Sequence, residues 1–395
     1  MAIAKIPIAG CKIPAKDILF SLKNIFQDEK IVDLLKEKFG SILNKRRLFF
    51  FNSGLSCFYL ILEALKQSSD KKEVILPAYT AGSLVVAVKK AGLTPVLCDI
   101  SLDDFNMDID SLGGVICEKT LCVLGVHMFG LVQKGLAELK ERFPDVFTIE
   151  DCAQAMGSKL KGKDVGIFGD ISFFSFNRGK NLSTYGGGMI AAGDGKISEL
   201  MQQAALSSGA PRLTLLEKTD ILFKLLALNL AINPLVYGLL YPVIARFKET
   251  MPPEDIIVRQ YSGVQAGVAL ALLDGLEDIG KNRRDTGMKL IAGLKGIEGI
   301  ILPKIDEATC PAFNRLPVIF EDLGKRERVE AVLCRQGIET SRLYHQPLHQ
   351  MFALGYKKDD FPNACYFAEH VLTLPTHPLL TECSLERIIT TIKNS

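Results

Sequence analysis

Residues 149–190 read IEDCAQAMGSKLKGKDVGIFGDISFFSFNRGKNLSTYGGGMI, and the rest of the chain is arranged around this segment. An apolar run at 147–151 ends in the acid Asp151, and a second run at 171–176 leads into a loop that carries Lys180. Short runs rich in Ile, Phe and Thr are typical of β-strands. In an open α/β sheet, ligands bind outside the carboxyl ends of the strands. The segment therefore predicts an acid and an amine that face one ligand from opposite sides.

Such a pair suits pyridoxal 5'-phosphate (PLP). A lysine holds the aldehyde of PLP as a Schiff base, and a carboxylate beside the ring nitrogen keeps the pyridinium charged, so that the ring withdraws electrons. Lys180 fits the first role and Asp151 the second. The alternatives are that Asp151 caps a helix beginning at Cys152 and that Lys180 is one of many solvated lysines.

A phosphate site is predicted near the N-terminus of a helix. The apolar run 48–51 ends at Asn52-Ser53-Gly54, and residues 56–65 follow with a helical pattern. The first amides and the dipole of a helix face an anion in this arrangement, and glycine lets the backbone come close. The alternative is an ordinary strand-to-helix turn. His127 follows another apolar run, and we interpret it as a structural hydrogen-bonding residue.

Motifs along nearly the whole chain support the cofactor. The central ones are IEDCAQAMGS, FSFNRGKN and GGGMI, and around them, in order, lie FNSGLSCFYLILEAL, EVILPAYTAGSLVVAVKKAGLTPVLCDI, VHMFG, SGVQAGVALALL, YHQPLH and FPNACYFAEHVLTLPTHPLLT. Each motif alone is a weak signal. Together and in this order they resemble the DegT/DnrJ/EryC1/StrS family of PLP-dependent sugar aminotransferases.

The resemblance implies PLP-dependent transferase fold type I, which is aspartate aminotransferase-like. We expect an α/β/α sandwich with a mainly parallel sheet at residues 1–258 and a smaller C-terminal α+β domain at 259–395. The strand, helix and strand pattern at 73–99 also favours a parallel sheet. Within the first domain, residues 213–247 form an unusually apolar insertion. It predicts a hairpin of two helices, the second beginning at Pro234, because proline is favoured at the first helical position.

The implied activity is transamination of a nucleotide-linked keto sugar by an amino acid donor such as glutamate, in the biosynthesis of amino sugars and cell-surface polysaccharides. Lys180 would bind the cofactor covalently and then act as the acid and base, and Asp151 would pair with the pyridine nitrogen. The resemblance also implies cofactor contacts from Gln154 near the ring hydroxyl, from Ser175 at the phosphate, and from the amides of Gly54, Leu55 and Ser56 as a phosphate cradle.

Several positions depart from the family pattern. Leu55 replaces a threonine, and Gly186 replaces an acid in the glycine run. Ala81 stands where an aromatic ring usually faces the cofactor, with Tyr79 as the expected substitute. Family members complete each site from a neighbouring subunit, so we expect a homodimer. Because Val258 replaces the asparagine used there, Arg259 or Gln260 is the expected contact in trans.

Composition excludes several other classes. The chain of 395 residues has a net charge of +2 with dispersed Lys and Arg, which gives no reason to expect nucleic acid. Ten cysteines without a CxxC pair argue against zinc and a disulfide framework, so no metal is expected and a reducing cytoplasm fits. The first ten residues lack the apolar core of a secretory signal, and we expect no export.

Three alternatives remain open. A sugar dehydratase of the same fold carries a histidine in place of the lysine, and Lys180 argues against it. A non-catalytic, membrane-associated binding or regulatory protein would retain the fold without the chemistry. The hairpin at 213–247 is expected to pack on its own subunit or a partner; alternatively, it contacts the inner face of the membrane peripherally, with Lys218, Lys224, Arg246 and Lys248 near the headgroups.

Overall fold

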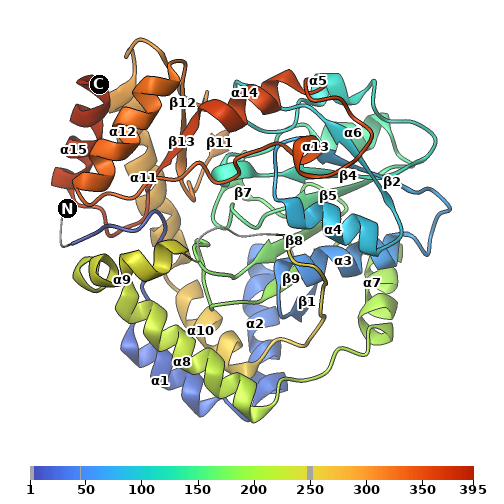
Figure 1. Ribbon diagram of the computed structural model, residues 1–395. Coiled ribbons are helices and arrows are strands. Elements are labelled where there is room, and N and C mark those ends of the chain that lie inside the picture. The colour runs from blue at the N-terminus through green and yellow to red at the C-terminus, as the bar shows by residue number, and fades with distance from the viewer. Residues whose placement is uncertain (1–3, 45, 247–251) are drawn as a thin grey trace.

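The computed structural model describes residues 4–44, 46–246 and 252–395. A large central sheet is covered by helices on both faces, and a smaller α+β part built from C-terminal residues lies beside it (Figure 1). The predicted fold type is confirmed.

The large sheet has the strand order β1-β9-β8-β5-β4-β2-β3. Strands β8, β5, β4, β2 and β3 are parallel to one another, β9 is antiparallel to β8, and β1 is antiparallel to β9. Asp151 pairs with Val126 and Phe173, so β4, β5 and β8 end at the same edge. The bounds are β1 Arg47–Phe51, β2 Glu73–Pro77, β3 Thr94–Cys98, β4 Thr120–Val126, β5 Phe147–Asp151, β8 Ile171–Ser175 and β9 Gly188–Ala192.

Neighbouring residues of a strand point to opposite faces, and each face has its own core. Ile190 belongs to the core under α3, α4 and α7, whereas Met189 packs on the side of α2 and α10. A third cluster, around Val123 and Leu139, lies beneath α5 and α6. The bounds are α2 Asp28–Ile42, α3 Gly54–Leu65, α4 Gly82–Lys90, α5 Ile109–Leu112, the short 3-10 helix η1 Met128–Gly130, α6 Leu136–Arg142, α7 Lys196–Ser207 and α10 Gly263–Leu273.

The C-terminal part has an antiparallel sheet of order β10-β12-β13. A third small sheet, β11-β6-β7, joins this part to the large one. Helix α10 packs on α1 and α2, and α11 packs on α15. The domain division at residue 258 stays a prediction. The bounds are β6 Lys159–Leu160, β7 Lys163–Asp164, β10 Ile300–Ile301, β11 Thr309–Cys310, β12 Leu316–Phe320, β13 Val371–Leu374, α11 Leu276–Leu294, α12 Leu323–Arg335, α13 Leu348–Met351, α14 Pro362–His370 and α15 Glu382–Lys393.

The apolar pattern of residues 261–279 predicts one long helix. This prediction is wrong, because the chain turns at Asp274-Gly275 and begins α11 at Leu276. Glycine at this turn weakens a helix, and the apolar pattern alone hides the break. At residues 339–341 the structure shows one isolated bridge, between Ser341 and Thr373.

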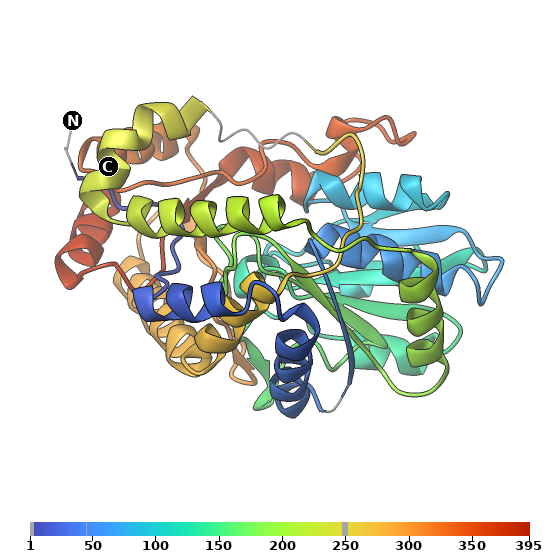
Figure 2. The same ribbon diagram turned by 90° about the horizontal axis from the view of Figure 1, so that it is seen from below.

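The predicted apolar hairpin is formed by α8 (Leu215–Ala231) and α9 (Pro234–Arg246). Thr214 and Glu217 form a capping box at the start of α8, and Pro234 opens α9. Figures 1 and 2 place α8 alongside α1 (Ala15–Lys23). Among the described helices, none alone has the length and apolar character of a membrane span, but Leu215–Ala231 and Pro234–Pro242 together pass that test with a bend of 106°.

Candidate active site

Asp151 and Lys180 lie at the shared carboxyl edge of β5 and β8. Asp151 is the last residue of β5, and Lys180 lies in the loop after β8, where its amide donates to Asn177 O (3.3 Å). Asn314 holds this loop in place, since its Nδ2 donates to Gly179 O (2.7 Å). Burial lowers the pKa of Lys180 to about 8, although the Asp151 carboxylate opposes the shift. The structure thus brings a carboxylate and a partly deprotonated amine to one site.

Asp151 is buried and keeps one oxygen available. Its Oδ1 accepts a hydrogen bond from Ala153 N (2.8 Å), and no donor within the described residues reaches its other oxygen. Burial raises the pKa of Asp151, while Ala153 N–H and Lys180 lower it. Residues 153–157 form turns, so no helix begins at Cys152. A cationic ring nitrogen would supply the partner that the free oxygen lacks.

The predicted phosphate cradle lies where β1, β8 and β9 meet the start of α3. A Cβ on Gly54 would come within 2.9 Å of Ser175 Cβ, and one on Gly188 within 2.5 Å of Gly54 N. Glycine at both positions therefore lets the backbones meet. The Leu55 amide has no acceptor among the described residues, whereas the Ser56 amide donates to Ser53 Oγ (3.0 Å).

Ser175 and Gln154 both retain capacity to hold a ligand. Ser175 Oγ accepts from Asn177 N at 3.4 Å, and its own proton has no acceptor in the part of the chain that the structure describes. Gln154 Oε1 accepts from Phe129 N (3.2 Å), and its Nε2 donates only to the Met128 thioether (3.4 Å), a weak acceptor. These residues fit the phosphate and ring hydroxyl of PLP, respectively.

A segment from the end of the insertion crosses the cradle of its own chain. Ile257 O accepts hydrogen bonds from Asn52 Nδ2 (2.8 Å) and Ser56 Oγ (3.3 Å). Arg259 N donates to Asn52 Oδ1 (3.0 Å), and its guanidinium pairs with Glu217 (3.1 Å). Contact of this segment with a second subunit stays a prediction.

Tyr79, expected as the substitute for a ring at Ala81, is fixed in the core. Its hydroxyl donates to Arg342 O (3.1 Å) and its ring packs edge-on against Phe367 at 4.7 Å between centroids. Tyr344 lies 5.6 Å from the Tyr79 ring and within electrostatic range of Asp151, since that carboxylate adds to burial in raising the pKa of Tyr344. Tyr344 is a further candidate site residue, which was not predicted although its motif YHQPLH was noted.

Glu150 and His127 form a buried network behind Asp151. His127 Nδ1 accepts from Gln133 N (2.9 Å), so Nε2 carries the proton and donates to Glu150 (3.1 Å). Glu150 also accepts from the amides of Gly166, Phe168 and Gly169 at 2.7–2.8 Å. Burial raises the pKa of Glu150, but these donors outweigh it and leave the pKa low. The ligand atoms of His127, Glu150 and Cys152 lie within 4.8 Å of one another, yet hydrogen bonds already use those of the first two.

Replacing Glu150 with glutamine is expected to lower the free energy of unfolding by about 3 kcal/mol. A glutamine amide turns its own donors toward backbone N–H groups, so at least one buried donor loses its acceptor. Urea unfolding measures the effect. Glu141→Gln, an exposed control, should change stability by less than about 0.5 kcal/mol. Equal urea midpoints for the Glu150 variant and the parent would show that the network does not stabilise the fold.

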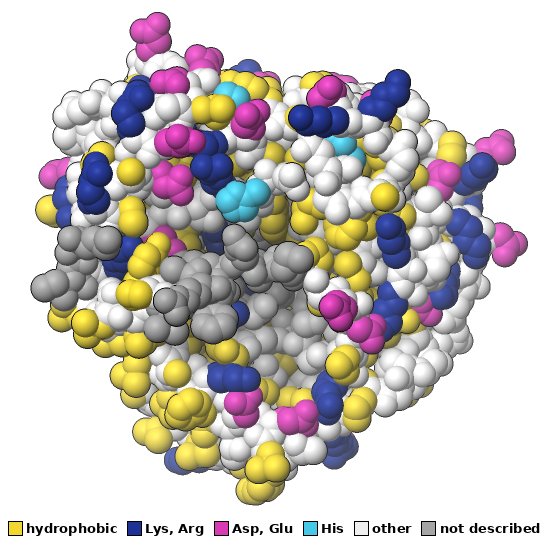
Figure 3. Space-filling model, viewed as in Figure 1, with side chains coloured by type: hydrophobic (Ala, Val, Ile, Leu, Met, Phe, Trp, Pro, Cys, Tyr) yellow, Lys and Arg dark blue, Asp and Glu magenta, His cyan; other side chains and the backbone are white. Residues whose placement is uncertain are grey.

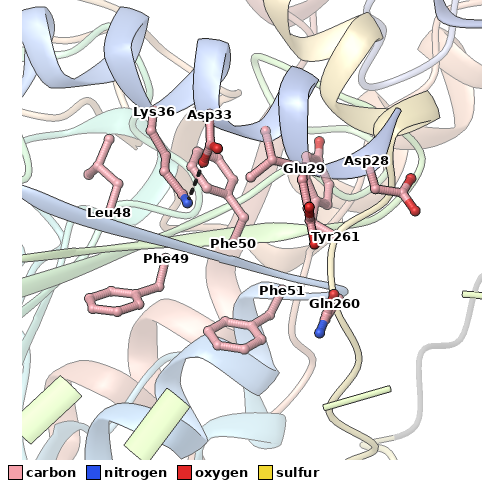
Figure 4. Close-up of a pocket in the computed structure, with 11 residues that line it drawn as sticks. Asp28, Glu29, Asp33, Lys36, Leu48, Phe49, Phe50, Phe51, Gln260 and Tyr261 are labelled. Atoms are coloured by element: carbon pink, nitrogen blue, oxygen red, sulfur yellow. Dashed lines mark hydrogen bonds and ion pairs between the residues drawn. The ribbon is translucent and has the colours of Figure 1, made fainter. Parts of the chain in front are cut away.

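Figure 4 shows a separate pocket of about 360 Å³ between α2 and β1. Asp28, Glu29 and Asp33 of α2 line one wall, and aromatic residues of β1 line the other. Neither Asp151 nor Lys180 belongs to it. The pocket therefore does not add to the PLP site, although its lining residue Gln260 bridges to Phe51 beside the cradle.

Known structures share this architecture. A putative sugar aminotransferase, Spr1654 from Streptococcus pneumoniae, in its PMP form, superimposes with a TM-score of 0.80 at 22% identity, covering 99% of this chain and 97% of that one. This likeness shows the fold. Together with the half-buried Lys180, the carboxylate and the helix N-terminus, it defines an enzyme of the aspartate aminotransferase-like class.

The model of the DegT/DnrJ/EryC1/StrS aminotransferase family matches residues 20–216 and 260–393. The chain belongs to this family and is a PLP-dependent aminotransferase. The unmatched residues 217–259 contain α9 and most of α8, which agrees with the predicted insertion.

Relatives in other organisms carry specific names. The chain is 27% identical over 347 residues to UDP-N-acetyl-3-dehydro-alpha-D-glucosamine 3-aminotransferase of Acidithiobacillus ferrooxidans, covering 87% of this chain and 82% of the relative. It is 28% identical over 348 residues to dTDP-3-amino-3,4,6-trideoxy-alpha-D-glucose transaminase of Streptomyces venezuelae, covering 87% and 81%.

Proposed function

We propose that this enzyme transfers the amino group of an amino acid, such as glutamate, to a nucleotide-linked keto sugar. The observation that carries the proposal is the pairing of Lys180, whose pKa is lowered to about 8, with the buried Asp151 beside the cradle. PLP supplies the electron sink when bound. Lys180 moves the proton between carbon atoms, and Asp151 keeps the ring nitrogen protonated. The names of the relatives support a nucleotide sugar as acceptor.

The test incubates the PLP-loaded protein with L-glutamate and a panel of UDP-, dTDP- and GDP-linked keto sugars. Mass spectrometry should find 2-oxoglutarate and an aminated nucleotide sugar in equal amounts. Loss of water from the sugar without amination would instead support the dehydratase. A protein that neither binds PLP nor aminates any acceptor would support the non-catalytic alternative.

We propose that the enzyme is a homodimer in which residues 257–260 approach a neighbouring site. The support is the position of this segment over the phosphate cradle, held by Asn52 and Ser56. Light scattering at assay concentration should give twice the 43.4 kDa chain mass. A monomeric mass in active protein would refute this assembly.

We also propose that the hairpin contacts the inner surface of a membrane. Its exposed apolar side chains include Leu216 (81% exposed), Phe223 (70%) and Leu239 (72%), so the described chain does not cover them. Hydrophobic side chains gather over α8 and α9 at the left and lower left of Figure 3. The role predicted for Lys218 at the headgroups is wrong, because Lys218 is buried and pairs with Asp28 (2.6 Å). Lys224 pairs with Asp220 (2.5 Å). Lys248 and the Arg246 side chain lie outside the described residues.

Vesicle flotation tests the membrane contact. The protein should float with anionic liposomes, and Leu216→Glu together with Leu239→Glu should leave it in the soluble fraction while it remains folded, because burying these charges in the interface is unfavourable. Leu206→Glu on α7, an exposed leucine outside the hairpin, is the control. If the parent does not float and the double variant breaks the dimer, the face is a subunit interface.

A further inference from the structure

Arg315 is a half-buried arginine without a hydrogen-bond or ion-pair partner among the described residues. In the part of the chain that the structure describes, its guanidinium donates to no acceptor and no carboxylate pairs with it, and its Nε is fully buried. Two other arginines differ from it, because their terminal nitrogens make hydrogen bonds: Arg46 Nη2 donates to the carbonyl of Ile167 (2.8 Å), and Arg283 Nη2 to that of Gly10 (2.9 Å). A cation whose Nε is shielded from water and has no partner is unfavourable, so this position favours a bound anion.

Arg315 lies near the loop that carries Lys180. It immediately follows Asn314, whose side chain holds the Lys180 loop through Gly179 O (2.7 Å). The charge of Arg315 helps to lower the pKa of Lys180, so the two cations lie within electrostatic range. Around Arg315 stand the tyrosines Tyr79, Tyr237 and Tyr344, and no acid contributes to its environment. An anion bound here would therefore lie close to the reacting amine.

The cofactor phosphate is not the expected anion, because its cradle is formed elsewhere, by Gly54, Leu55 and Ser175. In a nucleotide sugar, the diphosphate is separated from the keto carbon by bonds of the sugar ring. In an amino acid, the α-carboxylate is attached to the carbon that bears the reacting amine. The α-carboxylate is therefore closer to the reacting atoms than the diphosphate is, which matches the position of Arg315 near Lys180.

We propose that Arg315 binds the α-carboxylate of the amino acid donor and thereby selects α-amino acids. The inference rests on the proposed transamination from an amino acid. A guanidinium presents two parallel N–H groups to a carboxylate, and this pair is strong and directional. Binding also neutralises the charge that repels protonated Lys180.

The test compares L-glutamate with 4-aminobutyrate, which lacks the α-carboxylate, as donors to the PLP-loaded protein. Conversion of the cofactor is followed by its absorbance, without any sugar. Arg315→Gln should slow the reaction with L-glutamate about 100-fold and change that with 4-aminobutyrate less than about threefold. Arg315→Lys should restore part of the preference for L-glutamate over 4-aminobutyrate, because lysine retains the positive charge but not the two parallel N–H groups. Calorimetry should show glutarate binding at least about tenfold weaker to Arg315→Gln than to the parent.

Stability separates this role from a structural one. Arg315→Gln should leave the melting temperature of the protein unchanged or higher, since it removes an unpaired charge. Arg283→Gln, the control, should lower the melting temperature, because its guanidinium holds three carbonyl groups, and should retain the donor preference.

The outcomes distinguish the two proposals. If the parent converts L-glutamate and Arg315→Gln retains the same preference for it over 4-aminobutyrate, the role of Arg315 is wrong and transamination stands. An equal slowing of both donors also contradicts selection by the α-carboxylate. If the parent binds PLP but converts no L-amino acid, the proposed function fails and this assignment fails with it.

Discussion

Lys180→Ala is expected to reduce amino transfer by a factor of at least about 1000 and to leave the fold intact. The amine both binds the cofactor covalently and moves the proton, so no neighbouring group replaces it. Lys180→Arg should fail as well, because a guanidinium stays protonated and does not add to an aldehyde. Borohydride reduction followed by peptide mapping should place the cofactor on Lys180 in the parent and on no peptide of the alanine variant.

Lys163→Ala is the matched control. Lys163 belongs to the same sequence segment but is exposed, so its loss should change neither turnover nor cofactor attachment. Reduced cofactor on a peptide that does not contain Lys180 would show that the assignment is wrong.

The pKa of Lys180 gives this prediction a pH dependence. An ammonium does not attack an aldehyde, so capture of PLP by cofactor-free protein requires the neutral amine. With a pKa of about 8, the capture rate should rise with pH up to about 8 and level off above it. A solvated lysine would show a rate that is still rising at pH 10. Because the Asp151 carboxylate raises the pKa of Lys180, Asp151→Asn should shift the midpoint to lower pH.

Local patterns were enough to predict the elements that form the site. The strand at 147–151 was predicted at the bounds observed, and the strand, helix and strand pattern at 73–99 contains β2, α4 and β3, because turn residues or charges limit each apolar run. The hairpin followed from an apolar pattern interrupted by Asn233-Pro234. The order of the motifs then identified the edge where Asp151 and Lys180 lie, since parallel strands place their carboxyl ends together.

Features that depend on distant partners could not be predicted. The sequence suggests that Lys218 is a surface residue of α8. Its burial depends on an ion pair with Asp28 of α2, which is distant in the sequence. Glu150 alternates with Asp151 along β5, so its side chain points to the opposite face of the sheet, where three backbone amides meet it. The missing counter-ion of Arg315 is a property of its surroundings, and the residues before and after it carry no signal of it.

Asp151→Asn is expected to lower turnover by about 100- to 10,000-fold with PLP still bound. The buried carboxylate has one free oxygen, and burial raises its pKa. A pyridinium partner at that oxygen would lower the pKa again. An asparagine keeps the shape and the hydrogen bond from Ala153 N but removes the charge, so the ring nitrogen loses its proton and the ring withdraws electrons less strongly.

The cofactor phosphate should still be held by the cradle, since Leu55 and Ser175 lie on other elements than Asp151. Retention of PLP in the variant is measured by its absorbance after gel filtration, and turnover is measured with L-glutamate. Asp164→Asn, a partly exposed acid of β7 in the same sequence segment, serves as the control and should retain full turnover. Asp151→Glu should recover little activity, because the longer side chain moves the charge away from the ring nitrogen. Near-normal turnover in Asp151→Asn would show that another group, or none, holds that proton.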